Sequence, residues 1–567
     1  MKPWLAHYDS GVRPSLAPYP DKTLIDYLDQ LASEHPSNAA LLFKGATMTY
    51  RELDSLSTAF AAALDALGIR KGDRVAVLLP NCPQFFVAEF GIWKAGGVVH
   101  PLNPTYSERE LESALASTAV ETVVALTPFY ARVKAVQSRT SVRRVIATSI
   151  KEYLPPVLRV LFTLLKEKKE GHHIGDLASG DLWFGDLLKA HRGATRPPVD
   201  VRPDDRAVVL SSGGTTGTPK GVVGLHRDYV LAGLQLVEWT NSAKEPWTDV
   251  IMLPLPMFHV YANVGVQPMA FLGPNPLALV PNPRDINDLL KTIKKVKPTF
   301  FSGIPTLYNA ILNHADVRAG KVDLRSMKLC FSGSAALMAE TKKQFEEKTG
   351  AHIVEGYSLT EAMMACTLNP VRGTQKLGSI GVPLPDVDVR IVDAEDGSKE
   401  LAANEVGELL VRAPQRMAEY WNNPGETALT LQRHGDGEPW IHTGDLVRMD
   451  DDGYLFIVDR KKDMIKTSGF QVWPREIEEV LASHPAVHEV AVAGVGDPKK
   501  GEVAKAWVVL KPDAHISEDE LRAFCRERLA PYKVPGAVEF RTDLPKSMVG
   551  KVLRRMLTAE HRSTGTR

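Results

Sequence analysis

The segment from Ser211 to Gly221 has the composition of a loop that could hold a phosphate chain. It runs Ser-Ser-Gly-Gly-Thr-Thr-Gly-Thr-Pro-Lys-Gly after an apolar stretch, residues 207–210, that predicts a buried strand. Glycines let a backbone approach a ligand closely, and the amide, hydroxyl and ammonium groups of such a loop can donate to phosphate oxygens. The lysine precedes glycine, so this is not a Walker A loop, and composition alone leaves a flexible polar turn as an equal alternative. The candidate residues are Ser212, Gly213, Gly214, Thr215, Thr216, Gly217, Thr218 and Lys220.

Four later residues could do chemistry but also have ordinary structural explanations. A lone histidine such as His259, in the apolar stretch 253–262, is more often a core residue than a catalyst. The carboxylate of Glu361 could bind Mg²⁺, although Thr-Glu is also a usual start of a helix. Asp445 offers two acceptor oxygens, although it could equally form a turn. Lys551 follows a glycine in a basic tail, which is normally a solvated surface.

Together, the loop and these residues resemble the ordered motifs of the adenylate-forming superfamily, which contains acyl- and aryl-CoA synthetases, peptide-synthetase adenylation domains and firefly luciferase. The resemblance covers residues 20–555. It implies ATP, Mg²⁺ and coenzyme A as cofactors and a small carboxylic acid as substrate. The implied reaction has two steps: the acid attacks the α-phosphate of ATP to give an acyl-AMP and pyrophosphate, and the thiol of coenzyme A then attacks the acyl-AMP and releases AMP.

The resemblance implies a role for each catalytic candidate. His259 orients the acid or gates its pocket, and Thr360 offers a hydroxyl to the α-phosphate. Glu361 supplies a carboxylate to Mg²⁺, with Thr216 as a second metal candidate. Lys551 reaches into the cleft from the C-terminal domain and offsets the charge that develops during acyl-AMP formation.

The same resemblance assigns the residues that bind the nucleotide and the coenzyme. Asp445 and Arg460 bind the ribose, and the ring of Tyr357 stacks on adenine. A loop that carries Lys466 and Gly469 forms the pantetheine tunnel once the C-terminal domain has turned about Lys462. The adenine and magnesium motifs also supply Gly333, Ser334, Ala335, Glu355, Gly356 and Ser358.

The residues around His259 bear on the substrate. A peptide-synthetase domain would carry an aspartate here to pair an α-ammonium group, whereas this chain has Met257, Phe258 and Val260. The string Pro-Met-Phe-His-Val-Tyr-Ala, with the Gly-Gly-Thr-Thr loop, looks most like bacterial medium- to long-chain fatty acid–CoA ligases. Asn263 stands where some long-chain members carry an aromatic gate, which leaves the chain length open.

Three other functions stay open. The first is a ligase for an aryl acid such as a hydroxycinnamate. The second is an acyl-AMP ligase that loads a carrier protein, but such enzymes usually have an insertion before the C-terminal domain, and none is evident between residues 458 and 466. The third is a silent nucleotide-binding scaffold, against which the intact set of Lys220, Glu361, Asp445, Arg460 and Lys551 weighs.

Composition limits the class of protein. The 567 residues are 44% hydrophobic and 24% charged, which is ordinary for a globular protein, and they are too many for one core. Lys plus Arg and Asp plus Glu both total 68, so no net basic charge favours nucleic acid. The four cysteines have no metal or redox spacing and predict buried free thiols. Without a signal or transit pattern at the start, we expect a cytoplasmic protein whose oligomeric state is open.

Alternating strand and helix patterns must position these groups. Capping boxes at Thr49-x-x-Glu52 and Ser107-x-x-Glu110 predict helix starts. The alternation predicts an α/β fold, with a large N-terminal domain of parallel sheets covered by helices, a small β-rich subdomain and a small mobile α+β C-terminal domain. The expected limits are 1–458 for the AMP-binding domain, 384–458 for its β-rich subdomain, 459–462 for the hinge and 463–567 for the C-terminal domain.

Residues 153–171 have a different pattern, in which an apolar run is followed by Lys-Glu-Lys-Lys-Glu. The run is too short and too charged to cross a membrane. It predicts an amphipathic helix that either lies on a lipid surface, as a peripheral contact at the inner membrane face, or packs on its own domain with its charges in solvent. Periodicity does not separate the two, and we favour the packed helix.

Overall fold

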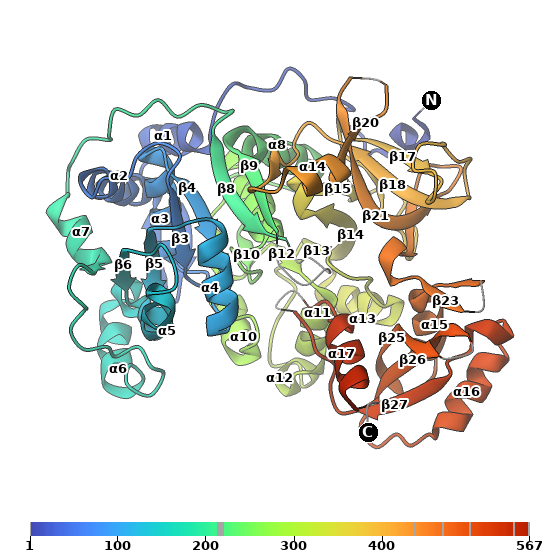
Figure 1. Cartoon of the computed structure of the whole chain (residues 1–567). Coiled ribbons are helices and arrows are strands. Elements are labelled where there is room, and N and C mark those ends of the chain that lie inside the picture. Colours follow the sequence, from blue (N-terminus) through green and yellow to red (C-terminus); the bar gives the residue numbers. More distant parts are fainter. Residues whose placement is uncertain are drawn as a thin grey trace.

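The computed structural model describes residues 2–212, 220–435, 437–467, 470–497, 500–547 and 550–564. It has the expected mixed α/β architecture, with two large sheets in the N-terminal part (Figure 1). The first sheet has the order β19-β9-β8-β4-β3-β5-β6-β7 and is parallel from β8 to β7. Its strands are β3 (Arg74–Leu78), β4 (Val98–Pro101), β5 (Thr122–Leu126), β6 (Arg144–Thr148), β7 (Leu182–Trp183), β8 (Arg206–Ser211), β9 (Gly221–Leu225) and β19 (Glu419–Tyr420).

The second sheet has the order β16-β15-β14-β13-β12-β10-β11-β1-β2 and is parallel from β14 to β1. Its central strands β10, β12 and β13 are buried and mostly apolar, as expected for a parallel sheet covered on both faces. The strands of the sheet are β1 (Ala39–Phe43), β2 (Ala46–Thr49), β10 (Ile251–Leu253), β11 (Leu277–Leu279), β12 (Phe300–Gly303), β13 (Leu329–Ser332), β14 (His352–Leu359), β15 (Met364–Leu368) and β16 (Val382–Pro383).

Helices flank these sheets, and local sequence explains where two of them start. α2 (Tyr50–Ala66) and α4 (Glu108–Ser117) each begin with the predicted capping box, in which the cap residue and the glutamate three positions later satisfy each other's backbone N–H groups. The other α-helices of this part are α1 (Leu24–Glu34), α3 (Pro83–Lys94), α5 (Thr127–Gln137), α6 (Pro156–Leu165), α7 (Phe184–Ala190), α8 (His226–Thr240), α9 (Gln267–Leu272), α10 (Ile286–Val296), α11 (Pro305–Asn313), α12 (Ala315–Arg318), α13 (Ala339–Thr349) and α14 (Pro424–Thr430).

Two smaller sheets follow. One has the order β17-β18-β21-β20, with β22 paired to β21. The other, with the order β24-β23-β26-β25 and β27 paired to β26, forms a separate small α+β unit with its own apolar core at the lower right of Figure 1. The strands are β17 (Asp388–Val392), β18 (Val406–Arg412), β20 (Leu431–Arg433), β21 (Pro439–Met449), β22 (Leu455–Arg460), β23 (Ile465–Thr467), β24 (Phe470–Val472), β25 (Val487–Asp497), β26 (Gly501–Leu510) and β27 (Ala537–Arg541), and the helices are α15 (Pro474–Ala482), α16 (Glu518–Arg526) and α17 (Arg554–Thr564).

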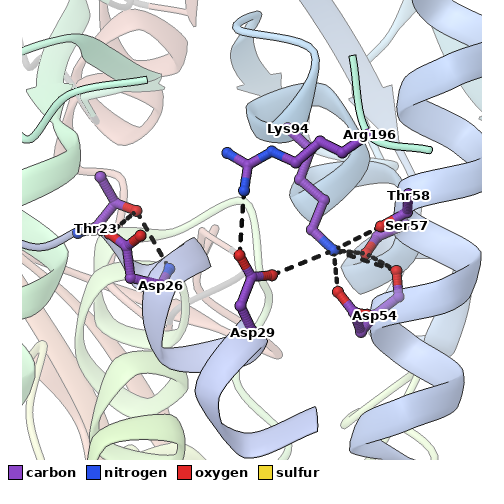
Figure 2. Close-up of polar contacts among 8 residues, drawn as sticks. All are labelled: Thr23, Asp26, Asp29, Asp54, Ser57, Thr58, Lys94 and Arg196. Carbon is purple, nitrogen blue, oxygen red and sulfur yellow. Dashed lines mark hydrogen bonds and ion pairs between the residues drawn. The ribbon is translucent and has the colours of Figure 1, made fainter. Parts of the chain in front are cut away.

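A buried lysine ties together the three helices that pack beside the first sheet (Figure 2). The ammonium of Lys94, at the end of α3, lies 2.5 Å from Asp54 Oδ1 on α2 and 3.8 Å from Asp29 Oδ1 on α1. The hydroxyls of Ser57 and Thr58 each accept from it at 3.0 Å. A buried cation persists only when charges and hydrogen bonds offset its desolvation, so this cluster fixes the packing of α1, α2 and α3.

The helix predicted within residues 153–171 is exposed, so the packed alternative that we favoured is wrong. α6 has no buried residue. Of its apolar side chains, Val157, Leu164 and Leu165 are 71%, 75% and 68% exposed. The helix projects from the lower edge of the molecule in Figure 1.

Two predictions about the whole chain can be compared with the fold. All four cysteines (Cys82, Cys330, Cys366 and Cys525) are free and buried, as predicted. No helix in the part of the chain that the structure describes combines the length and apolar character needed to cross a membrane.

Candidate active site

The predicted phosphate loop closes a hairpin between β8 and β9, which run antiparallel at the edge of the first sheet. The sequence analysis did not predict β9. The backbone N–H of Ser212 donates to the carbonyl of Lys220 at 2.8 Å and closes the base of the loop. Residues 213–219 lie outside the described residues, and the predictions for Gly213, Gly214, Thr215, Thr216, Gly217 and Thr218 therefore stay predictions.

Lys220 emerges from the hairpin toward a buried tyrosine that the sequence analysis missed. Its ammonium lies 5.0 Å from the ring centre of Tyr420 and 2.5 Å from Glu426 Oε2. The hydroxyl of Tyr420 in turn donates to Glu361 Oε1 at 2.7 Å. Tyr420 lies outside the sequence motifs described above, and the pairing of β19 with β9 brings it to the site.

Glu361 lies in a short 3-10 turn, Thr360–Ala362, directly after β14. Its carbonyl accepts from the backbone N–H of Met417 at 2.8 Å, so the turn is held from two sides. No cluster of three His, Cys, Asp or Glu side chains suited to a metal ion occurs among the described residues. One protein carboxylate fits Mg²⁺, which usually retains waters and takes further oxygens from substrate phosphates.

Asp445 and Arg460, predicted to bind the ribose, are adjacent on paired strands. Asp445 on β21 faces Arg460 at the end of β22, and Arg460 Nε lies 3.1 Å from Asp445 Oδ1. The hydroxyl of Tyr357 donates to Asp445 Oδ2 at 2.5 Å. Three residues from motifs up to about a hundred positions apart thus meet at one carboxylate. The sequence analysis grouped Asp445 with Arg460 but did not predict the bond from Tyr357, whose expected stacking on adenine stays a prediction.

Lys551 comes from the small C-terminal unit and reaches the same cleft. Burial lowers its pKa to about 8, with a further lowering by the charge of Arg460 that Asp445 and Glu361 oppose. Gly550, the residue before it, lies against α11 of the large unit. A side chain at this position would come within 2.8 Å of Thr306 Oγ1. The structure therefore brings the predicted adenylation lysine to the predicted ribose and metal residues.

His259 lies close enough to Lys551 for the charge of the lysine to affect the imidazole. Burial, and then the charge of Lys551, lower the pKa of His259 to about 3, so the imidazole is neutral near pH 7. Its Nδ1 accepts from the backbone N–H of Tyr261 at 3.3 Å. The neutral ring therefore carries its hydrogen on Nε2, where it can donate to a carboxylate.

The adenine motifs line a small cavity next to these groups. Gly333, Gly356, Tyr357 and Ser358 form one side, and the apolar side chains of Leu236, Tyr261, Val266, Met269, Met364 and Leu368 form much of the rest. The cavity measures about 30 Å³. At Gly333 a Cβ would lie 3.3 Å from the Tyr261 ring, so glycine keeps this approach open.

The remaining predicted residues are placed as follows. Glu355 is buried, which raises its pKa, while Lys342 at 3.8 Å opposes that rise. Ser334 has a positive φ of 71°, and Ala335 is exposed. Lys466 lies in β23 with an exposed side chain and is not brought to the cleft, whereas Gly469 lies outside the described residues. The tunnel role of Lys466 therefore stays a prediction.

Fold and site together define a nucleotide-binding enzyme in which a small C-terminal unit adds a cation to a cleft on a large α/β unit. The family model described as AMP-binding enzyme matches residues 28–421, and the model for the AMP-binding enzyme C-terminal domain matches residues 476–551. This chain therefore belongs to the AMP-binding enzyme family, as the sequence motifs predicted.

Similar proteins agree with this assignment along the whole chain. The chain is 41% identical over 563 residues to a long-chain-fatty-acid–CoA ligase of Bacillus subtilis, which covers 99% of this chain and 98% of the relative. It is 38% identical over 570 residues to the enzyme of that name from Escherichia coli O157:H7, with the same coverage. The crystal structure of the anthranilate CoA ligase AuaEII with anthranoyl-AMP superposes with a TM-score of 0.82 at 27% identity, covering 96% of this chain and 98% of that chain.

Proposed function

We propose that this protein is an ATP-dependent acid–thiol ligase that converts a medium- or long-chain fatty acid to its acyl-AMP and then to the acyl-CoA. ATP, Mg²⁺ and coenzyme A take part in the reaction. The observation that carries the proposal is the meeting of Lys551 with Asp445, Arg460 and Glu361 in one cleft. A scaffold that only bound nucleotide would not need a cation delivered there from a second unit.

In the first step, the protein's contribution is positioning and charge. The neutral His259 donates from Nε2 to the acid, and Lys551 stabilises the negative charge between the carboxylate and the α-phosphate. Asp445 and Arg460 hold the ribose, and Lys220 and Thr360 face the phosphates. Mg²⁺, held by Glu361, would offset phosphate charge.

In the second step, we propose that the C-terminal domain, residues 463–567, turns about a hinge at 459–462 relative to residues 1–458. The rotation withdraws Lys551 and presents the loop of Lys466 and Gly469 to coenzyme A. Lys462 lies within the short 3-10 turn Lys461–Asp463 between β22 and β23, and hinges are usually a few such residues in loops or at the ends of elements.

The apolar lining of the cavity and the names of the full-length relatives support a fatty acid as the substrate. In this conformation the cavity, at about 30 Å³, is smaller than a long acyl chain. Asn263 is fully buried and donates to Glu89 Oε1 at 2.6 Å, so it is engaged with the core. The anthranilate ligase likeness, at lower identity, keeps an aryl acid as the second candidate.

A substrate screen tests this function. Pyrophosphate release is measured with ATP and acetate, octanoate, palmitate or coumarate, each with and without coenzyme A. We expect the highest rates with octanoate or palmitate and acyl-CoA formation only with coenzyme A. Preference for coumarate would support the aryl-acid ligase, acyl-AMP that coenzyme A does not consume would support loading of a carrier protein, and no release with any acid would support a silent scaffold.

We also propose that α6 makes a peripheral contact with a membrane that supplies the acid. Its exposed apolar side chains are followed by the exposed cations Lys166, Lys168 and Lys169, which suit an anionic lipid surface. The inner side of the helix lines a cleft of about 920 Å³ that reaches Phe258, the neighbour of His259. The helix would thus join the lipid surface to the segment that holds the acid.

Vesicle sedimentation tests this contact. We expect the protein to bind vesicles of phosphatidylcholine and phosphatidylglycerol, and Leu164→Glu with Leu165→Glu to abolish the binding. The matched control changes Leu377 and Leu429, which are 67% and 64% exposed elsewhere, to glutamate. Equal binding by both double variants would contradict the proposal, as would an effect of the α6 changes on oligomeric state without any on vesicle binding.

A further inference from the structure

The strand that carries the ribose-binding aspartate has a pronounced bulge at that residue. His442 on β21 pairs with Leu410 on β18, and Leu446 pairs with Glu408, so three residues of β21 face the single residue between them. A bulge leaves backbone groups without ladder partners and re-aims the side chains that it contains. Here it turns Asp445 toward Arg460 and Tyr357.

Side chains satisfy the groups that the bulge frees. The hydroxyl of Thr443 donates to the Leu409 carbonyl at 2.8 Å and accepts from the Asp445 N–H at 3.1 Å. The N–H of Gly444 donates to Glu408 Oε1 at 3.1 Å. The conformation of the bulge therefore depends on Glu408 as well as on its own residues.

Glu408 also binds the residue next to Arg460. Its Oε2 lies 3.0 Å from the ammonium of Lys461, and its Oε1 lies 3.5 Å from Nδ1 of His442. Burial alone would raise the pKa of this carboxyl, whose side chain is 4% exposed, but His442 and Lys461 outweigh burial and lower it to about 2. Behind His442, the imidazole of His434 lies within 2.8 Å, Nε2 to Nε2.

We propose that Glu408 is a positioning residue for the nucleotide ribose. One of its oxygens fixes Gly444, the neighbour of Asp445, and the other fixes Lys461, the neighbour of Arg460. A single buried carboxylate thus sets the separation of the two residues that bind the ribose hydroxyls. This inference rests on the proposed use of ATP but is independent of which acid is activated.

The test compares nucleotides that differ only in the ribose. Glu408→Gln keeps the size of the side chain and an oxygen for Gly444, but it removes the charge that holds Lys461. We expect the dissociation constant for ATP, measured by calorimetry without any acid, to rise about tenfold, in line with one charged hydrogen bond. The constant for 2′-deoxy-ATP, which cannot engage the clamp fully, should rise much less.

Two further variants keep the result interpretable. Lys461→Met removes the partner of Glu408 at a half-exposed position, and it should reproduce the effect of Glu408→Gln even if that variant folds poorly. Glu405→Gln changes an exposed carboxylate just before β18 and should leave both constants unchanged. An equal weakening of ATP and 2′-deoxy-ATP by Glu408→Gln and Lys461→Met would overturn the inference, as would a change confined to the melting temperature. Failure of the acid screen alone would leave this binding result standing.

Discussion

The hydroxyl of Tyr420 donates a 2.7 Å hydrogen bond to Oε1 of Glu361 and so connects the sheet edge beside the phosphate loop to the carboxylate proposed to hold Mg²⁺. Lys220 lies over the same ring at 5.0 Å. One aromatic residue therefore contacts both the lysine proposed to face the phosphates and the carboxylate proposed to hold Mg²⁺.

Tyr420→Phe should weaken magnesium dependence without removing the carboxylate. Loss of a partner that orients a metal ligand typically lowers metal affinity about tenfold or more. We expect the Mg²⁺ concentration for half-maximal pyrophosphate release to rise by about that factor, and the affinity for the acid to stay the same. Tyr19→Phe is the control, because Tyr19 also donates its hydroxyl hydrogen to a carboxylate, that of Asp386, but lies outside the site. An unchanged Mg²⁺ dependence in Tyr420→Phe would refute this role.

Lys551→Ala should separate the two half-reactions. Formation of acyl-AMP should fall roughly a hundredfold to a thousandfold, as when one charge-stabilising donor is removed, because Lys551 brings its charge from the small unit to Asp445 and Glu361. Thioester formation from supplied acyl-AMP should persist. Lys546→Ala alters a lysine of the same segment that pairs instead with Glu489 at 2.6 Å, and it should leave the first step intact. Equal losses in both steps would contradict the assignment of Lys551.

The pH dependence of the first step should report the same lysine. Its pKa is lowered to about 8, so the stabilising charge is present below that pH and is lost above it. We expect kcat/KM for ATP, which follows the free enzyme, to decline above about pH 8. Lys551→Arg, if active, should move this decline to higher pH, because guanidinium stays charged. A decline at the same pH in both proteins would mean that another group is responsible.

Glu89→Gln should stabilise the protein increasingly as pH rises. Burial raises the pKa of this carboxyl to about 8, although hydrogen bonds from Asn263 and Gln267 oppose the rise. Between the unfolded pKa, near 4.5, and about 8, the unfolded chain releases the proton first, so the native protein loses stability at up to about 1.4 kcal/mol per pH unit. Gln cannot ionise and escapes this loss.

Urea unfolding at pH 5, 6, 7 and 8 measures the difference. The free energy of unfolding of Glu89→Gln minus that of the wild type should grow across this range, while Glu405→Gln on the surface should show a flat difference. A Glu89→Gln curve parallel to the wild type would show that Glu89 is ionised in the native state throughout.

Much of the site could be predicted from sequence because its chemistry lies in short, local strings. The capping boxes before α2 and α4 depend on residues three positions apart, and both formed as predicted. The motifs around His259, Glu361, Asp445 and Lys551 can be identified from their residue types and from the order in which they follow one another along the chain. The structure brings these four regions to one cleft, in agreement with the family motifs.

Tyr420 and Glu408 could not be found in this way, because their roles depend on which strands pair. Tyr420 reaches Glu361 only because β19 adds to the edge of β9, and Glu408 supports Asp445 only because β21 bulges opposite β18. Nothing in the residues next to Tyr420 or Glu408 distinguishes them from the other tyrosines and glutamates of the chain.

The sequence by itself determined the family, the alternation of strands and helices in the N-terminal part, and the chemical groups of the site, because these follow from residue type and short-range spacing. Only the tertiary structure decided which side chains are exposed and which charges meet. α6 has the same amphipathic pattern whether it packs inward or faces outward, and the surface that the rest of the domain offers left it exposed. Likewise, the lowered pKa values of His259 and Lys551 arise from burial and from charges far away along the chain, Lys551 for His259 and Arg460 for Lys551, which no local pattern specifies.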